Sequence, residues 1–517
     1  MSDEVKLEGP DLTLGIETAD IPAGGMLVGH VNGEAVLVCR TDAGLFAVGA
    51  TCTHYGGPLA EGMITGTTIH CPWHHGMFDL RDGSVLAPPP FNALPCWRTE
   101  IDGNRIVVRE KRVATSPPAV PEAPARMVIL GSGAAGHMAA ETLRNEGYTG
   151  TVTMISADRD LPFDKPNLSK DYLAGNAPEE WIPLRDAAFY AEKNIDVRLD
   201  TRVAAIDVPN RSIRTEGGES ILYDRLLIAT GADPFVPPIP GADLPQVHVL
   251  RTFRDSRAII DAASVAKHAV VIGAGFIGLE VAASLITRGL QVDVVAPDDV
   301  PLGRVLGSDL GAFVRKIHEE KGVRFHLGGT VSAIENERVL LADGTVVDCD
   351  LVVIGTGVKP ATALAAAAGI LVDNGIVVDQ FLQSSAPDVY AAGDLARWRD
   401  ERSHEMRRVE HWAVAQRLGQ VAARNMLGKK EPYAYAPFFW SAHYDTVISY
   451  VGYAAKWDSA VVTGDLDARN ARVTYRANGR VVAVATIFRD QESLAIEAAM
   501  NRGDEAALEA IVNSPIA

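Results

Sequence analysis

Residues 127–156 read MVILGSGAAGHMAAETLRNEGYTGTVTMIS, and they give the strongest indication of the fold. A β-rich run leads into Gly131, Gly133 and Gly136, and a run of helix-forming residues and a second β-rich run follow. Three glycines at this spacing allow a tight turn, close approach of a pyrophosphate group and packing of the helix against the strand. The stretch therefore predicts a βαβ unit that binds a dinucleotide at the N-terminus of its helix.

A second stretch of the same kind occurs further along the chain. Residues 268–296 read HAVVIGAGFIGLEVAASLITRGLQVDVVA and contain Gly273, Gly275 and Gly278 at the same spacing. A repeat of this size indicates two Rossmann-like α/β domains rather than one.

A third signal identifies the ligand of the first unit as a flavin. Residues 386–394 read APDVYAAGD, so that a β-rich run leads into Gly393 and Asp394, and an Ala-Thr-Gly turn contains Thr230 and Gly231. A carboxylate at the end of such a strand can accept hydrogen bonds from the ribityl hydroxyl groups of a flavin. The combination predicts an FAD domain into which an NAD(H) domain is inserted.

These patterns predict a multidomain fold. We expect an N-terminal all-β domain of short strands, two Rossmann-like α/β domains, and a C-terminal α+β domain that ends in a helix. The linker is predicted from VATSPPAVPEAPA, which is rich in proline and small residues. The expected boundaries are 1–112 for the all-β domain, 113–125 for the linker, 126–248 with 377–437 for the FAD domain, 249–376 for the NAD(H) domain and 438–517 for the C-terminal domain.

The composition limits the possible partners and compartments. The net charge of −18 argues against nucleic acid and against an anionic membrane surface. No apolar run approaches the roughly 18–20 residues of a membrane span, and the first residues lack the features of a signal peptide. Five scattered cysteines do not form a disulfide framework. We expect a cytoplasmic protein, as a monomer or homodimer.

The N-terminal domain contains a set of candidate metal ligands. Cys52 and His54 precede Cys71 and His74 in the pattern C-x-H-(x16)-C-x-x-H. Two thiolates and two imidazoles can hold a [2Fe–2S] cluster in which one iron takes both cysteines and the other both histidines. The same four ligands could also bind zinc, which is the alternative interpretation.

The loops CTHYGGPL and CPWHHGMFD resemble those of Rieske domains, which favours the [2Fe–2S] cluster. They lack the additional cysteine that each loop of a respiratory Rieske protein carries, so the domain is more similar to low-potential Rieske ferredoxins. The second loop departs from the usual C-P-W-H-G because His75 is inserted before Gly76. Spacing favours His74 as the ligand.

In both units, the acidic residue that would hold the adenosine ribose is missing from its usual position at the end of the second strand. Asp158 is the candidate in the first unit, although it could equally be a solvated loop charge. In the second unit Ala296 occupies the usual acidic position, and Asp298 and Asp299 follow. No basic residue comes directly after this strand, so a pocket for the 2′-phosphate of NADPH is not expected and NADH is favoured.

Across essentially its whole length the chain resembles the ferredoxin-reductase and apoptosis-inducing-factor branch of flavoproteins with two dinucleotide-binding domains. LPFDKPNLSK, RVEHWAVAQRLGQVAARNMLG and FFWSAHYDTVISYVGYA carry the resemblance. It implies that Lys170 lies by the flavin and pairs with Glu280, that Trp412 packs near the nicotinamide, and that Trp440 lies near the flavin. The redox cysteines of the related disulfide reductases and thiol-dependent oxidases are missing from 164–170, which excludes thiol chemistry.

The resulting hypothesis is an NADH-dependent oxidoreductase that passes electrons through FAD to its Rieske cluster and on to an external acceptor, such as an oxygenase, a ferredoxin or a cytochrome. The alternatives are a slowly turning redox-signalling protein and an NAD(P)H oxidase. Lys170, Glu280 and Trp412 are the expected catalytic residues. The expected cofactor-binding residues are Gly131, Ser132, Gly133, Ala135, Gly136, Asp158, Lys165, Lys170, Val203, Thr230, Gly231, Gly273, Gly275, Phe276, Ile277, Gly278, Glu280, Gly357, Gly393, Asp394, Trp412 and Trp440.

Overall fold

The computed structural model describes residues 8–113, 119–120 and 123–516, so most of the proline-rich linker expected at 113–125 lies outside the described residues. The chain forms two compact units. The first contains the N-terminal residues up to Ala119 together with Arg489–Asn513, and the second contains Val120–Phe488 together with the last residues. The chain therefore passes between the units more than once.

The first unit is built on two antiparallel sheets, which confirms the all-β prediction for the N-terminal domain. Alternating apolar residues of the larger sheet form a core with Val36, Val38 and Trp97. In order across the larger sheet its strands are β1 (Ile16–Glu17), β10 (Arg105–Lys111), β9 (Cys96–Asp102), β4 (Gly44–Gly49), β3 (Glu34–Thr41) and β2 (Met26–Val31). The smaller sheet contains β5 (Met63–Thr65), β6 (Thr68–His70), β7 (Met77–Asp79) and β8 (Val85–Ala87).

The first unit also contains the C-terminal helices α9 (Asp490–Arg502) and α10 (Glu505–Val512). The expectation of one final helix is wrong, because Gly503 adopts a left-handed conformation with φ 65° and ends α9. Asp504 then caps α10 by accepting a hydrogen bond from the backbone N–H of Ala507. The region expected to form the C-terminal domain, 438–517, is thus divided between the two units.

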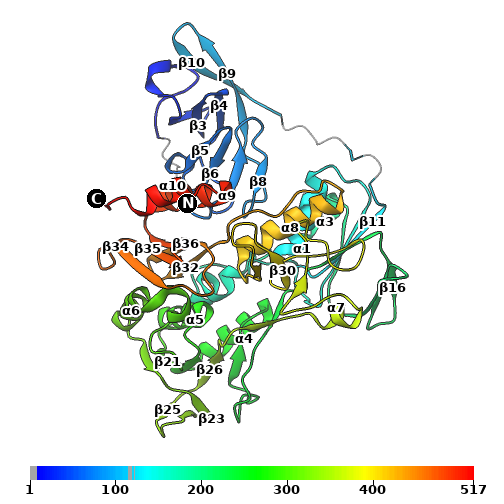
Figure 1. Ribbon diagram of the computed structural model, residues 1–517, viewed down its shortest axis with the longest axis vertical. Coiled ribbons are helices and arrows are strands. Elements are labelled where there is room, and N and C mark those ends of the chain that lie inside the picture. Colours follow the sequence, from blue (N-terminus) through cyan, green and yellow to red (C-terminus); the bar gives the residue numbers. More distant parts are fainter. Residues whose placement is uncertain (1–7, 114–118, 121–122, 517) are drawn as a thin grey trace. The chain divides into compact units, whose positions relative to one another are not determined.

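The second unit contains two parallel five-stranded sheets of similar topology (Figure 1). In each sheet the central strand is the one that precedes a glycine-rich turn. The first sheet has the order β13 (Ile195–Arg198), β12 (Thr151–Ile155), β11 (Arg126–Leu130), β17 (Arg225–Ile228) and β29 (Val389–Ala391). The second has the order β22 (Arg324–Leu327), β21 (Gln291–Ala296), β20 (His268–Ile272), β26 (Leu351–Ile354) and β19 (Val247–Val249).

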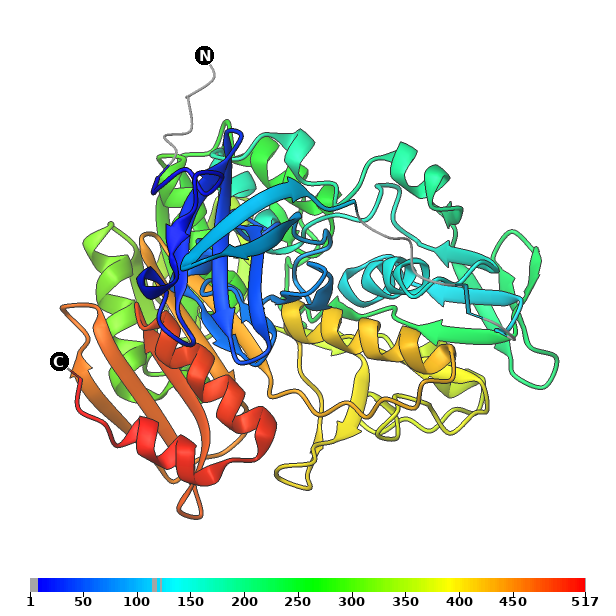
Figure 2. The same cartoon turned by 90° about the horizontal axis from the view of Figure 1, so that it is seen from above.

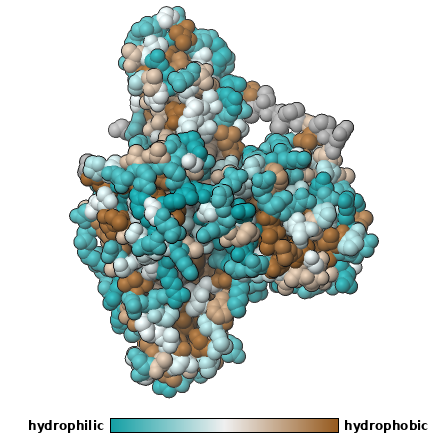
Figure 3. Space-filling model, in the orientation of Figure 1, coloured by the Kyte–Doolittle hydropathy of each residue, from teal (hydrophilic) through white to brown (hydrophobic). Residues whose placement is uncertain are grey.

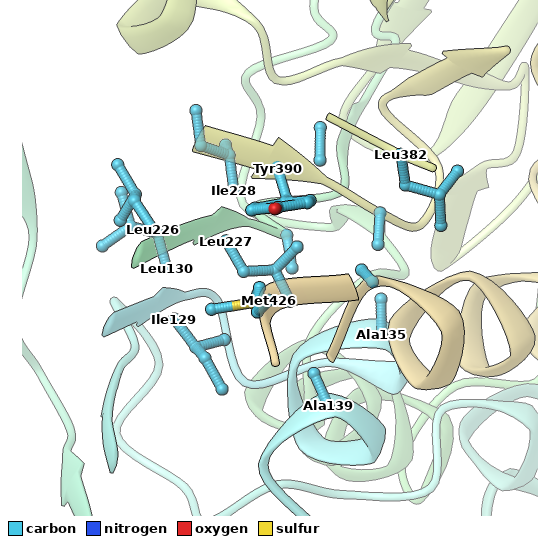
Figure 4. Close-up of a cluster of buried hydrophobic side chains, with 14 of the residues drawn as sticks. Ile129, Leu130, Ala135, Ala139, Leu226, Leu227, Ile228, Leu382, Tyr390 and Met426 are labelled. Atoms are coloured by element: carbon cyan, nitrogen blue, oxygen red, sulfur yellow. The ribbon is translucent and has the colours of Figure 1, made fainter. Parts of the chain in front are cut away.

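Helices cover these sheets as expected for Rossmann-like domains. Apolar side chains of β11, β17 and β29 meet those of helices α1 and α8, including Ile129, Leu227, Tyr390 and Met426 (Figure 4). The helices of the unit are α1 (Ala134–Asn145), α2 (Asp171–Ala174), α3 (Ala187–Glu192), α4 (Phe253–Ala263), α5 (Phe276–Thr287), α6 (Gly303–Glu320), α7 (Ala363–Ala367) and α8 (Trp412–Met426).

Each half carries a small antiparallel sheet just before the strand that pairs with the central strand on the side away from the second strand of the βαβ unit, and one pair of further short strands joins the halves. In the first half these are β14 (Val203–Asp207), β15 (Ser212–Thr215) and β16 (Ser220–Leu222), and in the second half β23 (Val331–Glu335), β24 (Arg338–Leu341) and β25 (Val346–Asp348). The remaining short strands are β18 (Ala232–Pro234), β27 (Val358–Pro360), β28 (Ile376–Val377), β30 (Ala396–Arg399) and β31 (Met406–Arg407).

A third, antiparallel sheet completes the second unit. Its strands are β32 (Phe438–His443), β33 (Thr446–Gly452), β36 (Arg480–Ile487), β35 (Asn470–Ala477) and β34 (Ser459–Asp465), in this order. Its inner face joins the core of the second half through Phe439, Ile448 and Tyr475. The face of the protein drawn in Figure 3 is mainly hydrophilic, with smaller groups of hydrophobic residues between. In the described part of the chain, no helix has the length and apolar character needed to cross a membrane.

Candidate functional site

Both glycine-rich turns open onto one cavity of about 1890 Å³ in the second unit. This volume exceeds the roughly 300–1,000 Å³ of a pocket for one drug-sized ligand, so it is large enough for two dinucleotides. The cavity also receives side chains from β32, among them Phe439 and Trp440. All the predicted cofactor-binding residues line it except Gly136 and Gly278.

The first turn, between β11 and α1, is shaped by its glycines. Gly131 has φ 102°, and a Cβ atom there would lie 2.3 Å from the Ala229 carbonyl oxygen. A Cβ atom on Gly136 would lie 1.9 Å from the Gly131 carbonyl oxygen, so only glycine fits at this position. Gly136 packs against the turn itself and does not line the cavity. Gly133 caps α1, so the N-terminal N–H groups of the helix face the cavity and can bind phosphate.

The second turn, between β20 and α5, repeats this geometry. Gly273 has φ 112°, and a Cβ atom there would lie 2.4 Å from the Gly355 carbonyl oxygen. Gly278 again lies against the first glycine of its turn, with 2.1 Å between its added Cβ and the Gly273 oxygen. Gly275 caps α5, and a Cβ atom there would have no neighbour within 4 Å. These two cradles fit two dinucleotides of the predicted kind.

Of the acidic candidates for the riboses, Asp158 and Asp298 line the cavity and Asp299 does not. Asp158 follows Ser156, whose hydroxyl is hydrogen-bonded to Ser132 at 2.8 Å and accepts the Asp158 backbone N–H. In the second half, Asp298 accepts a hydrogen bond of 2.8 Å from Arg304 Nε. Arg304 lines the cavity but was missed from the sequence, because it lies beyond the residues that directly follow the strand.

Lys170 and Glu280 meet at the cavity wall, where the two halves join. Lys170 Nζ lies 2.8 Å from Glu280 Oε2, and the Ser169 hydroxyl donates to the same oxygen at 2.6 Å. Glu280 is only 3% exposed, and Ser441 of β32 donates to its other oxygen at 3.0 Å. The pair predicted by resemblance is therefore brought together in the structure, with two hydroxyl groups that sequence reasoning did not identify.

Further charged residues line the cavity near the first glycine-rich turn. Asp394 forms an ion pair of 2.9 Å with Arg251, which also lines the cavity and was not predicted. Burial and the neighbouring Arg251 lower the pKa of Lys165 to about 8. This cavity-lining lysine therefore loses its positive charge at a lower pH than an ordinary lysine does. Thr230 Oγ1 donates to the Ala361 carbonyl oxygen at 3.1 Å and fixes the turn that contains Gly231.

Aromatic residues close the same wall. Trp412, at the start of α8, and Trp440 line the cavity, as do Phe276 and Ile277 of α5. Next to Trp412, the His411 ring stacks on Phe439 with 4.0 Å between ring centres, and burial lowers the pKa of His411 to about 4. His411 is therefore neutral at physiological pH. Val203 and Gly357 lie elsewhere on the cavity wall.

The four predicted cluster ligands lie in the first unit and form two pairs. The Nδ1 atoms of His54 and His74 are 3.2 Å apart. The Cys52 thiol is hydrogen-bonded to Cys71, and this contact together with burial raises the pKa of Cys52. Among the described residues no three His, Cys, Asp or Glu side chains converge as they would around one metal ion. Two pairs of ligands suit the two irons of a [2Fe–2S] cluster.

The loops hold these pairs through short backbone contacts. The Cys52 N–H donates to the Gly57 carbonyl oxygen and the Cys71 N–H to the Gly76 carbonyl oxygen, both at 2.8 Å. A Cβ atom on Gly57 would lie 2.9 Å from Cys71 Sγ, so only glycine leaves this space open. Burial lowers the pKa of His54 to about 4, which keeps its imidazole neutral, as a metal ligand must be.

The inserted His75 is not part of the histidine pair. Its Nδ1 lies 2.6 Å from Glu497 Oε2, and both side chains are buried. This geometry supports His74 as the ligand, as its spacing predicts. The cysteines outside the motif are buried, and burial raises their pKa values, to about 12 for Cys39, 11 for Cys96 and 12 for Cys349, so they are unreactive thiols.

The chain matches three protein-family models. A pyridine nucleotide-disulphide oxidoreductase model matches residues 125–419, a Rieske [2Fe–2S] domain model matches 13–98, and a reductase C-terminal model matches 438–516. These matches confirm the resemblance and the set of cofactors predicted from the sequence, which are FAD, NAD(H) and a [2Fe–2S] cluster.

Similar proteins differ in how much of this chain they align with. Human apoptosis-inducing factor 3 is 30% identical over 91% of this chain and 81% of its own length. Rhodocoxin reductase of Rhodococcus erythropolis is 34% identical over 71% of this chain and 88% of its own length. The ferredoxin–NAD(+) reductase component of the biphenyl dioxygenase system of Paraburkholderia xenovorans is 36% identical over 70% of this chain and 89% of its own length.

The structures of two reductases are also similar to this chain. The covalent putidaredoxin reductase–putidaredoxin complex is 33% identical, with a TM-score of 0.72, over 76% of this chain and 99% of the compared chain. The ferredoxin reductase for the CYP199A2 system of Rhodopseudomonas palustris is 34% identical, with a TM-score of 0.68, over 70% of this chain and 91% of its own.

Proposed function

The chain belongs to the pyridine nucleotide-disulphide oxidoreductase family, and on this premise we propose that it is an NADH-dependent reductase that delivers electrons through its own Rieske domain to an external acceptor. The observation that carries the proposal is the shared cavity, onto which both glycine turns open and at which Lys170 and Glu280 join the two halves. When bound there, FAD supplies the conversion between the electron pair of a nicotinamide and the single electrons of an iron–sulfur cluster.

The residues around the cavity have separate tasks in this proposal. Lys170 holds a positive charge at the flavin end, and Ser169 and Ser441 hold the Glu280 carboxylate in place. Neutral His411, stacked on Phe439, adds an apolar surface beside Trp412 and helps to exclude water from the nicotinamide. No cysteine lies between 164 and 170, so electrons leave by a route other than a protein thiol.

The acceptor is proposed from the relatives and from the composition. The curated relatives include reductases named for rhodocoxin and for dioxygenase-system ferredoxins, which are one-electron carriers in electron-transfer chains. We therefore propose a ferredoxin, a cytochrome or an oxygenase as the acceptor of this chain. The free cysteines are compatible with a reducing compartment such as the cytoplasm.

A second candidate function rests on the relative that aligns over most of the chain, apoptosis-inducing factor 3. A redox-signalling protein would hold reduced flavin and NAD for a long time and turn over slowly. Stopped-flow absorbance distinguishes the candidates. Decay of the reduced flavin within the time of one turnover with cytochrome c supports the reductase, whereas a reduced complex that persists for minutes supports the signalling function.

The test of the relay uses the full chain, with Cys71→Ala as the variant and Cys96→Ala as its control. Cys96 is also a buried cysteine of the first unit but lies outside the ligand motif. Cys71→Ala should keep FAD and the reduction of ferricyanide, which takes electrons from flavin directly, and should lose the reduction of cytochrome c. Equal cytochrome c rates in Cys71→Ala and Cys96→Ala would show that electrons bypass the Rieske domain.

A further inference from the structure

The second ligand loop of the Rieske domain contains a residue without a task in the proposed electron transfer. His75 lies between His74 and Gly76, adopts a left-handed conformation with φ 57°, and is fully buried. A side chain with a Cβ atom adopts this conformation only at a cost, which is justified when the surrounding contacts fix it.

The contact that fixes His75 comes from the other end of the chain. His75 Nδ1 lies 2.6 Å from Oε2 of Glu497, a residue of α9 that is 1% exposed and 422 positions away in sequence. The same helix makes a second contact near the first ligand loop, where Gln491 Nε2 donates to the Glu61 carbonyl oxygen at 3.3 Å. These contacts are part of why Arg489–Asn513 forms one compact unit with the N-terminal residues.

We propose that the His75–Glu497 hydrogen bond anchors the second ligand loop to α9, so that the C-terminal helix pair is a structural part of the cluster-binding unit. His75 is then a positioning residue for the adjacent ligand His74. The Cys71–Gly76 backbone hydrogen bond closes the loop on both sides of these histidines, and it transmits the position of His75 to the cluster ligands. This proposal rests on the assignment of His74 as a cluster ligand.

The experiment compares Glu497→Ala with Glu34→Ala in the full chain. Glu34 is an exposed carboxylate of the same unit that is bonded to Lys111, so the control removes the same atoms and charge away from the ligand loops. We expect Glu497→Ala to lose the visible absorbance of the cluster at least about ten-fold faster in the presence of a chelator, because a buried hydrogen-bonding group loses its partner. Its reduced cluster should also give a shifted electron paramagnetic resonance spectrum.

Two further variants separate anchoring from general destabilisation. Glu497→Gln keeps an acceptor oxygen and should retain the wild-type spectrum and a nearly wild-type loss rate. His75→Asn suits the left-handed backbone but cannot reach α9, so it should reproduce the loss in Glu497→Ala and substitutes for that variant if Glu497→Ala does not accumulate. Loss rates equal to that of Glu34→Ala in both variants overturn the anchor, whereas a wild-type protein without iron and sulfide overturns the cluster assignment itself.

A separate observation concerns the Glu280 carboxylate in the second unit. Beyond Ser441, His443 Nε2 lies 3.3 Å from the Ser441 hydroxyl, and His443 Nδ1 lies 3.1 Å from Nε2 of His318 in α6. All three residues are buried, and desolvation is the main reason that the pKa values of His443 and His318 are lowered to about 3. Both imidazoles are therefore neutral, with one donor and one acceptor nitrogen each.

The Glu280 carboxylate, at the end of this series of hydrogen bonds, determines which atom donates in each bond. An ionised carboxylate only accepts, so the Ser441 hydroxyl donates to Glu280 and must accept from His443 Nε2–H. His443 Nδ1 is then an acceptor, and His318 Nε2–H donates to it. Neither histidine was identified from the sequence as a site residue, because the three residues meet only when α6 and β32 pack together.

We infer that Ser441, His443 and His318 are positioning residues. They keep the Ser441 hydroxyl directed at the Glu280 carboxylate, and this carboxylate in turn fixes Lys170 at the flavin. The inference rests on the proposed role of the Lys170–Glu280 pair. Breaking the chain leaves more of the Glu280 negative charge uncompensated, so the midpoint potential of bound FAD should become more negative. The rate of flavin reduction by NADH should fall about ten-fold, the scale of one hydrogen bond to a charged group.

The test measures the flavin potential and the reduction rate in Ser441→Ala, His443→Leu and the double variant. Because the two changes break one chain, the double variant should shift the potential no further than either single variant. His443→Gln retains an N–H donor toward Ser441 and should restore the wild-type potential. If His443→Leu has the wild-type potential while Ser441→Ala does not, the histidines only fill space and the inference is wrong; if all variants behave as wild type, Glu280 itself has no role at the flavin.

Discussion

The two halves of the second unit have the same phosphate-binding turn but different surroundings. In each half the first glycine lies against the carbonyl oxygen of the residue that follows the neighbouring strand, and the third lies against the first, with nearly the same distances. Around each turn four parallel strands have the same order, and an antiparallel insertion precedes the same strand, but the fifth strand comes last in the chain in the first half and first in the second. The two turns alone therefore do not determine which dinucleotide is bound tightly and which is exchanged.

The difference lies in the elements that pack on the helix after each turn. Helix α1 lies side by side with α8, and the two approach so closely that a Cβ atom on Gly419 would lie 2.1 Å from the Ala135 carbonyl oxygen (Figure 2). The N-terminus of α5 is more open: Ile277 is 47% exposed, and Gly275 has free space in front of it. We expect the first half to retain FAD and the second to exchange NADH.

The largest effect is expected when the third glycine of each turn is replaced by a larger residue. Gly136→Val places a side chain against the Gly131 oxygen and should give protein without FAD, since the helix can no longer approach the strand. Gly278→Val makes the same change in the second half and should leave FAD bound while weakening NADH binding by about 100-fold or more. Flavin absorbance of the purified protein and titration with NADH under anaerobic conditions measure the two effects.

The control for this pair is Gly275→Ala, whose added Cβ has no protein neighbour within 4 Å. It should leave the thermal stability unchanged and affect NADH binding alone. Loss of FAD from the Gly278→Val protein would show that the two halves do not bind their ligands independently.

A second prediction concerns the Lys170–Glu280 ion pair, which joins the halves at the cavity wall. Lys170→Met removes the cation and leaves the buried Glu280 without it, so the rate of flavin reduction should fall about 100-fold. Rapid-mixing measurements at saturating NADH give this rate. Lys316→Met, which removes a lysine from an exposed ion pair with Asp467, should leave the rate unchanged.

The third prediction concerns acid stability in the second half. Burial alone would raise the pKa of Asp293, but hydrogen bonds from Arg324, His268 and His326 outweigh it and lower the pKa to about 2. The carboxylate therefore stabilises the fold fully above about pH 4, and this contribution of roughly 2 kcal/mol is lost as the pH falls from about 4 to about 2. Denaturant unfolding at several pH values should show a flatter dependence for Asp293→Asn over that interval, and an unchanged slope would contradict the assignment.

The smallest expected effect concerns the choice between NADH and NADPH. Asp298 engages Arg304, the cavity-lining arginine that could otherwise bind a 2′-phosphate. Asp298→Asn should lower the ratio of kcat/KM for NADH over NADPH about ten-fold, because it releases the arginine from its charged partner. Arg304→Ala added to this variant should cancel the gain for NADPH, and steady-state kinetics with both nucleotides can check each step.

The candidate site could be predicted from the sequence wherever its residues lie in one local motif. The glycines of each turn and the four candidate cluster ligands fall into this class, because spacing along one or two loops already limits how they can approach one another. Arg251, Ser441 and Arg304 could not be predicted in this way. Arg251 meets Asp394 across 143 positions, and Ser441 reaches Glu280 across 161, so both contacts depend on how distant segments pack.

Residue types and their spacing were enough to predict the fold class, the two glycine-rich dinucleotide turns and four candidate [2Fe–2S] ligands, since backbone turns and metal coordination make local demands that a few residue types satisfy. The tertiary structure alone decided that the C-terminal helices belong with the Rieske domain and that His75 faces Glu497. It also decided how Ser441, His443 and His318 reach Glu280. Such contacts depend on the burial of side chains far apart in sequence, and burial is a property of the packed chain rather than of any one segment.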